Sequence, residues 1–150
     1  GIHAGKSSFS TTASLNHHLS DNAVSVKAAI DAMTSGGFTN LKDGIDLAAA
    51  EMANPGDSHD RADLTSPDKM IVITDGHPNR PFPSSTADDL AAASADAARS
   101  AGAELFVVGV GGDVDATYLQ NEIADDASHY FSVSNYSALQ NTLQNLDLCQ

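Results

Sequence analysis

The sequence predicts an α/β fold: a doubly wound, mostly parallel sheet with helices on both faces and one antiparallel edge hairpin. Two continuous apolar runs carry this prediction, Met70–Ile73 and Leu105–Val110. Runs rich in β-branched residues are typical of strands buried on both faces of a parallel sheet. Segments with apolar residues at helical spacing separate the runs. Strands that alternate with helices imply crossover connections, and hence a parallel sheet.

A hairpin is expected first, from about Gly5 through Thr11 and back along a second strand. His17 and His18 are adjacent, so on a strand their side chains point to opposite faces and do not bind one metal together. We expect these two histidines at a solvated tip or edge of the hairpin.

Two helices follow the hairpin. Asp21 or Asn22 is a suitable N-cap for the first, which is expected to begin near Ala23 and to end at 36–37, a Gly-Gly pair. Its expected apolar stripe, at helical spacing, consists of Val26, Ala29, Ile30 and Met33. The second is expected over 41–53, with Leu, Ile, Ala and Met side chains along one face.

The remaining elements follow the first buried strand. Three prolines between His77 and Ser85 exclude regular structure there. The pattern then predicts a helix over 86–101 capped by Gly102, a strand over 104–110, a helix starting at Asp115, a strand over 129–133 and a helix over 137–146.

Size and charge narrow the possible functions. The 150 residues suit one domain, and 41 % apolar with 18 % charged residues is ordinary for a globular protein. The net charge of −13 argues against nucleic acid as a partner, because that binding depends on Lys and Arg at phosphates. No apolar stretch approaches the roughly 20 residues that span a bilayer, so no membrane insertion is expected.

Asp75 is the first candidate functional residue. It follows the buried strand within Thr74-Asp75-Gly76, where open α/β sheets bind their ligands. A simple turn is the alternative, since Asp-Gly is a common turn pair. We expect no enzyme, because no glycine-rich phosphate loop is present and no Lys stands beside Asp75.

Several segments, taken in order, resemble a von Willebrand factor type A domain. They are Gly36–Ile45 before a helix, Ile71–Gly76 and Val107–Gly111 at strand ends, and Tyr130–Val133 near the end of the chain. The resemblance implies the vWA form of the predicted fold and a metal-ion-dependent adhesion site at one edge of the sheet. In that family three loops supply the site: Asp-x-Ser-x-Ser, a Thr and an Asp.

The matching metal ligands in this sequence are Thr39 and Asp75. The ion would be Mg²⁺, or Mn²⁺ or Ca²⁺, held by hard oxygen atoms, with a protein ligand's acidic side chain completing its coordination. If no metal binds, Thr39 is expected to act as a helix cap and Asp75 as a turn former.

The family's Asp-x-Ser-x-Ser motif is absent from the 150 residues. The resemblance therefore implies a single domain over 1–150 that is N-terminally incomplete, without the first strand and helix. Family strand order 3-2-1-4-5-6 places that strand centrally, so another segment is expected to supply it. The alternative is that the hairpin strand pairs directly with Met70–Ile73. With only Thr39 and Asp75, divalent cations should bind weakly or not at all to this chain alone.

The resemblance predicts a metal-assisted adhesion or protein-recognition module of a cell-surface or secreted protein. The alternative is a structural or assembly domain that binds no metal. Cys149 is the single cysteine. It is either a lone thiol or half of a disulfide, and the family implies pairing with a cysteine upstream of Gly1, in an oxidising compartment.

Overall fold

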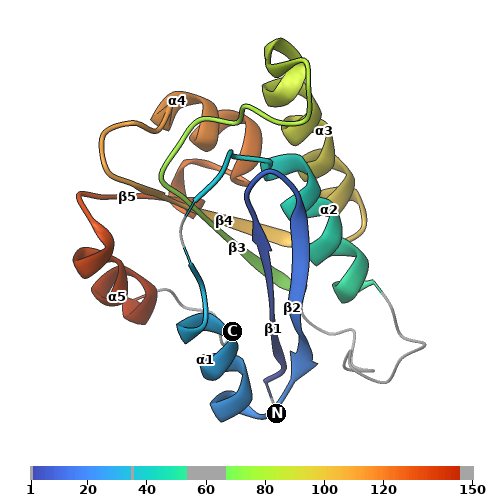
Figure 1. Cartoon of the computed structure of the whole chain (residues 1–150), viewed down its shortest axis with the longest axis vertical. Coiled ribbons are helices and arrows are strands. Elements are labelled where there is room, and N and C mark those ends of the chain that lie inside the picture. Colours follow the sequence, from blue (N-terminus) through green and yellow to red (C-terminus); the bar gives the residue numbers. More distant parts are fainter. Residues whose placement is uncertain (1, 35, 54–66, 146–150) are drawn as a thin grey trace. The chain divides into compact units, whose positions relative to one another are not determined.

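The computed structural model describes residues 2–34, 36–53 and 67–145 (Figure 1). Cys149 lies outside the described residues. The chain divides into two compact units. The first comprises residues 1–65 and 78–91, and the second comprises residues 66–77 and 92–150.

The first unit is built on an antiparallel hairpin of β1 (Ala4–Phe9) and β2 (Ala13–Ser20). Helices α1 (Ala23–Asp31) and α2 (Leu41–Met52) both contact this hairpin. The hairpin and both helix starts agree with the sequence prediction.

Helix α1 ends earlier than predicted. Its side-chain cap is Asn22, whose Oδ1 accepts from the backbone N–H of Ser25, but the helix stops at Asp31 rather than at the glycine pair. Val26 is the buried residue of α1, whereas Ile30 and Met33 are 51 % and 55 % exposed. The expected apolar stripe does not pack beyond Asp31, so little tertiary burial supports a longer helix.

The two adjacent histidines of β2 do point to opposite sides. His17 Nε2 lies 2.9 Å from Ser25 Oγ of α1, and His18 Nδ1 lies 3.0 Å from Glu51 Oε2 of α2. Glu51 is 8 % exposed and also accepts from the backbone N–H of Leu19 at 2.8 Å. The histidines therefore lie within β2, not at the tip of the hairpin, and link the strand to both helices.

The second unit holds a three-stranded parallel sheet in the order β3-β4-β5. Its strands are β3 (Lys69–Thr74), β4 (Glu104–Val110) and β5 (Tyr130–Val133). Strand β4 is central and buried from its second residue to its last, as the sequence predicted.

Helical elements follow β3 along the chain. Their bounds are η2 (Ser84–Thr86), α3 (Ala87–Ser100), α4 (Ala116–Tyr118), the π-helical turn η3 (Leu119–Ile123), η4 (Ala127–His129) and α5 (Tyr136–Asn145). Helix α3 buries four alanines along one stripe, and Gly102 ends it with a φ of 102°. Leu139 and Leu143 of α5 pack against a buried cluster that includes Val108 of β4.

A charged network joins the amino ends of the three strands. The Lys69 ammonium lies 3.4 Å from Glu104 Oε2, and Glu104 Oε1 lies 2.9 Å from His129 Nε2. His129 Nδ1 is 2.8 Å from Asp126 Oδ1, so both ring nitrogens face carboxylates. Hydrogen bonds to Asp126 and Glu104 raise the pKa of His129 despite its partial burial.

The described strands form two separate sheets, β1-β2 and β3-β4-β5, and no ladder joins them in the described part of the chain. Strand β3 is thus an edge strand of its sheet, although Met70 and Val72 on it are buried. Among the described strands, the hairpin does not pair directly with Met70–Ile73.

No helix within the described residues is long and apolar enough to cross a bilayer.

Candidate metal and ligand-binding site

Asp75 stands at the carboxyl end of β3, as predicted. The strand ends at Thr74, whose Oγ1 donates to the backbone carbonyl of Gly76 at 3.1 Å and so tightens the turn that carries Asp75. Asp75 is exposed, and its Oδ2 accepts a hydrogen bond from the Tyr136 hydroxyl at 2.9 Å. Oδ1 has no hydrogen-bond partner among the described residues.

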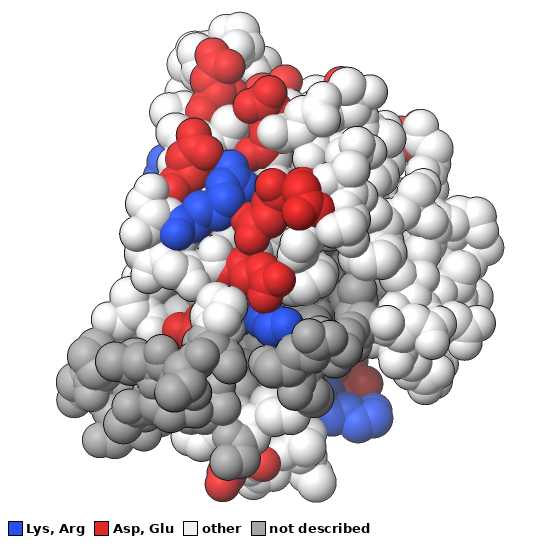
Figure 2. Space-filling model, turned by 180° about the vertical axis from the view of Figure 1, so that it is seen from behind, with Lys and Arg blue, Asp and Glu red and all other residues white. Residues whose placement is uncertain are grey.

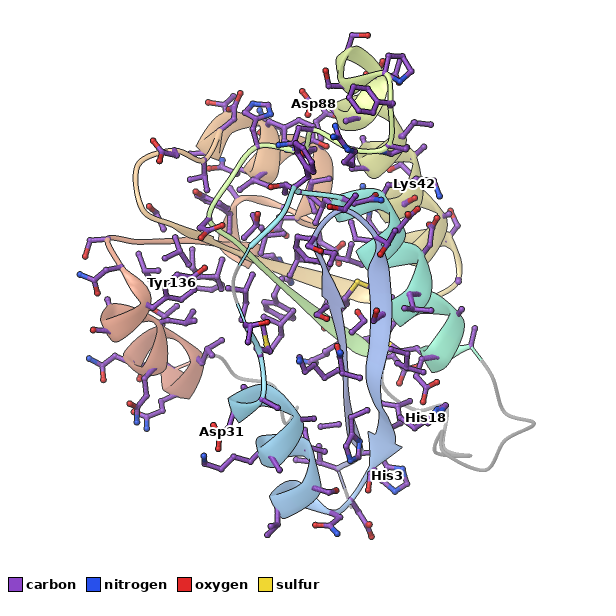
Figure 3. All side chains as sticks on the ribbon, in the orientation of Figure 1. His3, His18, Asp31, Lys42, Asp88 and Tyr136 are labelled. Atoms are coloured by element: carbon purple, nitrogen blue, oxygen red, sulfur yellow. The ribbon has the colours of Figure 1, made fainter. Side chains whose placement is uncertain are left out.

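Tyr136, labelled in Figure 3, is the first residue of α5 and is 59 % exposed. Partial burial of its hydroxyl and the hydrogen bond to Asp75 raise the pKa of Tyr136. The tyrosine therefore stays protonated at neutral pH and donates to the carboxylate. Any cation that takes Asp75 Oδ2 as a ligand must displace or share this hydrogen bond.

His77 lies in the same turn region as Asp75 but faces other partners. Its Nε2 is 3.4 Å from Asp115 Oδ2, and its ring stacks on Tyr118 with centroids 5.9 Å apart. Asp115 also caps α4 by accepting from the backbone N–H of Tyr118, and this bond is the main cause of its lowered pKa. This arrangement holds His77 to the loop after β4.

Thr39 lies in the first unit, in the segment that leads into α2. Its backbone is fixed from both sides: its N–H donates to Asn79 Oδ1 at 2.9 Å, and its carbonyl accepts from the N–H of Asn79 at 3.0 Å. The backbone N–H of Arg80 donates to the same carbonyl at 3.3 Å. No described residue forms a hydrogen bond with the Thr39 hydroxyl, so that oxygen is available to a ligand.

The cap of α2 is Asn40, not Thr39. Asn40 is 3 % exposed, and its Oδ1 accepts from the backbone N–H of Asp43 while its Nδ2 donates to the carbonyl of Thr11. Either Asn or Thr can cap a helix, but an amide both accepts and donates, so it also binds the hairpin turn. The expectation that Thr39 caps this helix is therefore wrong, and the role of Thr39 without metal is not capping.

The two predicted metal ligands lie in different compact units. Their chemistry fits a hard cation: one hydroxyl and one exposed carboxylate, both with an uncommitted oxygen. No group of three or more His, Cys, Asp or Glu able to hold a metal occurs among the described residues. The oxygen atoms of Thr39 and Asp75 therefore suit a hard cation, but they provide only two protein ligands.

Sequence reasoning missed an aromatic–arginine stack beside Thr39, formed by Phe38, Arg80 and Phe82. The guanidinium carbon of Arg80 lies 3.5 Å from the ring centroid of Phe38 and 3.8 Å from that of Phe82. Contacts of this kind contribute about 0.5–1 kcal/mol each at exposed sites. The signal in the sequence is an Arg and a Phe among the prolines of the segment 78–83, and the prolines by themselves predict only irregular structure.

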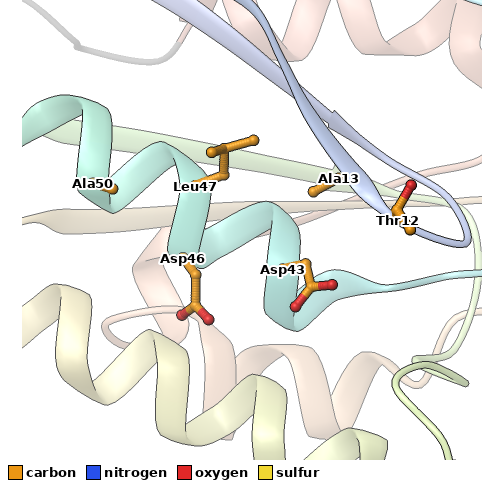
Figure 4. Close-up of a pocket in the computed structure, with 6 residues that line it drawn as sticks. All are labelled: Thr12, Ala13, Asp43, Asp46, Leu47 and Ala50. Atoms are coloured by element: carbon orange, nitrogen blue, oxygen red, sulfur yellow. The ribbon is translucent and has the colours of Figure 1, made fainter.

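An open hollow of about 340 Å³ lies between the hairpin turn and α2 (Figure 4). It is lined by Thr12, Ala13, Asp43, Asp46, Leu47 and Ala50. The Lys42 ammonium pairs with the carboxylates of Asp46 and Asp43 in this lining, and these interactions raise the pKa of Lys42. One ammonium against two carboxylates leaves the hollow with an excess of negative charge.

Residues 1–145 match the family model for the von Willebrand factor type A domain. The chain belongs to this family. vWA domains generally mediate protein–protein interaction rather than catalysis, and they often bind a divalent metal at a metal-ion-dependent adhesion site. The predicted family and the predicted fold are both confirmed.

Solved structures share the fold of this vWA domain. Proximal thread matrix protein 1 (PTMP1) from the mussel byssus is 19 % identical with a TM-score of 0.75, covering 93 % of this chain and 35 % of that one. Another PTMP1 structure has a zinc-occupied MIDAS motif. BatB from Bacteroides thetaiotaomicron is 19 % identical with a TM-score of 0.69, covering 94 % and 75 % of the two chains.

The pilus adhesin SpaC from Lactobacillus rhamnosus GG is 16 % identical with a TM-score of 0.70, covering 95 % of this chain and 24 % of SpaC. The vWA domain thus spans about a third of PTMP1 and a quarter of SpaC. No curated protein sequence matches the chain.

Proposed function

We propose that this vWA domain is a metal-assisted adhesion or protein-recognition module of a cell-surface or secreted protein. The observation that carries the proposal is the exposed carboxylate of Asp75 at the carboxyl end of a parallel strand. Open α/β sheets bind ligands at this edge. The adhesin SpaC and the zinc-occupied PTMP1 share the fold, which supports both parts of the proposal.

Thr39 and Asp75 would hold the cation, which we propose is Mg²⁺, Mn²⁺ or Ca²⁺. The ion would supply an open coordination position for an acidic side chain of the protein ligand. Thr39 is suited to this role because its backbone is fixed by Asn79 while its hydroxyl is uncommitted. With two protein ligands, binding by this chain alone is expected to be weak.

The free edge of β3 is proposed to take up a further strand from a segment outside these 150 residues. β3 is an edge strand in its described sheet, yet Met70 and Val72 on it are buried like residues of a central strand. An apolar strand with one open edge is a template for further pairing. Such a strand would also bring its own loop to the carboxyl edge of the sheet, near Asp75.

A structural or assembly domain that binds no metal is the second candidate. The hydrogen bond from Tyr136 to Asp75 favours it, because it gives this carboxylate a partner without any cation. PTMP1 is by its name a matrix protein, which is consistent with an assembly role for the fold.

The proposed location outside the cell depends on Cys149. We propose that it forms a disulfide with a cysteine outside these residues, which requires an oxidising compartment. Mass spectrometry of the native protein tests this point: a disulfide-linked Cys149 peptide supports it, and a free thiol removes it.

Thermal unfolding with and without Mg²⁺ or Mn²⁺ distinguishes the two candidate functions. An ion at ten times its dissociation constant stabilises the folded state by about 1.4 kcal/mol, or roughly 3–6 °C in Tm for a chain of this length. The metal-assisted proposal predicts this rise in the unmodified protein and its loss in Asp75→Asn. Asp31→Asn, which removes another exposed carboxylate, should keep it. If Tm does not rise at any ion concentration up to about 50 mM, which is about 50 times a dissociation constant of about 1 mM, the structural candidate is supported instead.

A further inference from the structure

Most of the basic side chains of the described residues are neutralised by carboxylates within the protein. Four of them pair with carboxylates: Lys27, Lys42, Lys69 and Arg99. On the face shown in Figure 2, acidic side chains predominate and basic ones lie beside them. Within the described part of the chain only Lys6 and Arg80 have no carboxylate partner, and the Lys6 ammonium donates to the backbone carbonyl of Ala29. Arg80 is thus an unneutralised cation in a chain of net charge −13.

Arg80 is also held in place without using most of its donors. Phe38 and Phe82 cover its guanidinium, as described above, and Nη1 donates to the backbone carbonyl of Asn79 at 3.0 Å. A guanidinium has five N–H donors, and ring contacts on its plane leave the donors at its edge free. The two rings are themselves 47 % and 71 % exposed. The result is a preorganised cation surrounded by exposed apolar surface.

We propose that the aromatic–arginine stack binds a carboxylate of a protein ligand, with an apolar side chain of that ligand packed against the two phenyl rings. The inference rests on the proposed protein-recognition function and gives its partner a chemical class: a segment in which an acidic residue adjoins an apolar one. Arg and aromatic residues dominate the energetically important positions of protein interfaces, and a guanidinium edge matches a carboxylate with two parallel hydrogen bonds.

The position of the stack supports this assignment. The backbone N–H of Arg80 donates to the carbonyl of Thr39, so the stack is tied to the loop that carries the proposed metal ligand. A ligand bound near Thr39 would therefore be within reach of Arg80. The amount of charge selects the ligand: a single carboxylate is attracted by Arg80, whereas nucleic acid or a second copy of this acidic chain carries many negative charges and would meet stronger repulsion from the rest of the surface.

An NMR titration in EDTA tests the proposal. The probe is the peptide acetyl-Leu-Asp-Leu-amide, and its control is acetyl-Leu-Asn-Leu-amide, which has the same shape without the charge. We expect the acidic peptide alone to shift the Arg80 side-chain N–H and the ring resonances of Phe38 and Phe82. Arg80→Gln should weaken binding about tenfold or more, whereas Lys27→Gln, which removes the same charge from α1, should leave the dissociation constant unchanged.

Phe82→Leu is a second variant, at a side chain so exposed that the fold should tolerate the change, and it should weaken binding about threefold. Equal binding of the two peptides, unchanged affinity in Arg80→Gln, or shifts confined to other residues would overturn the proposal. Concentration-dependent dimerisation that Arg80→Gln abolishes would also overturn it, by making a second copy the occupant. Because EDTA removes divalent ions, failure here leaves the Mg²⁺ experiment unaffected, and failure of Mg²⁺ binding leaves this titration unaffected.

Discussion

Substituting Gly44 with alanine should destabilise the domain even though alanine is the better helix former. An alanine Cβ at this position of α2 would lie 2.5 Å from Cδ1, 3.0 Å from Cγ and 3.1 Å from Cβ of Phe9 on β1. Carbon atoms in van der Waals contact lie about 3.5–4.0 Å apart. Rotating the Phe9 ring cannot relieve the contact with its Cβ, so strand and helix must separate.

The expected magnitude follows from two opposing contributions. Alanine gains about 1 kcal/mol over glycine within a helix, and overpacking of this kind costs about 1–3 kcal/mol. Separation would also lengthen the 3.2 Å hydrogen bond from Ser7 Oγ to the Gly44 carbonyl, which is worth about 1 kcal/mol. We therefore expect Gly44→Ala to lower the free energy of unfolding by about 1–2 kcal/mol.

A double-mutant cycle in urea, followed by circular dichroism, measures this effect. In the Phe9→Ala background the obstructing ring is gone, so Gly44→Ala should stabilise by up to about 1 kcal/mol. The coupling energy between the two sites should thus be about 2–3 kcal/mol. An equal effect of Gly44→Ala in both backgrounds, or stabilisation of the unmodified protein, would refute the close packing of β1 on α2.

Two further predictions concern buried and networked charges. Glu51→Ala removes the acceptor of the Leu19 N–H and should lower the free energy of unfolding, measured in urea, by about 1–3 kcal/mol. Glu51→Gln keeps an acceptor and should lose less stability, and equal losses in the two variants would contradict this role. Because the pKa of His129 is raised in the folded state, its interactions add stability that is complete below about pH 6.5 and is lost as the pH rises through the folded-state value. Hydrogen bonds lower the pKa values of Glu104 and Asp126, so the stability that these two carboxylates add is lost in acid. Tm should therefore be highest between about pH 4 and 6.5, and His129→Gln should remove the decline above that range; an unchanged decline would assign it to another group.

The sequence was sufficient for the elements whose burial is strong and local. Apolar periodicity and turn residues predict the runs that form β3 and β4, the start of each helix, and the position of Asp75 at a strand end. The end of α1 did not, because the stripe through Ile30 and Met33 predicts packing that these exposed side chains lack. Periodicity shows which face could be buried, but not whether another element covers it.

The functional site was less predictable than the fold. The family resemblance identified Thr39 and Asp75, but no local pattern could show that Asn40 caps α2 or that Tyr136 donates to Asp75. Both residues make contacts with partners distant in sequence, Asn40 with Thr11 and Tyr136 with Asp75. The stack of Phe38 on Arg80 spans 42 positions in the sequence and is likewise visible only in the folded chain.

Paramagnetic relaxation by Mn²⁺ tests the central claim that Thr39 and Asp75 serve one cation site. Mn²⁺ broadens NMR resonances close to it, so substoichiometric addition to the labelled protein maps where the ion binds. The account predicts selective broadening of the amide signals of Thr39 and Asp75 together, and loss of both effects in Asp75→Asn but not in Asp31→Asn. Broadening confined to other acidic residues, such as Asp43 and Asp46, or broadening at Asp75 that leaves Thr39 unaffected, would contradict it.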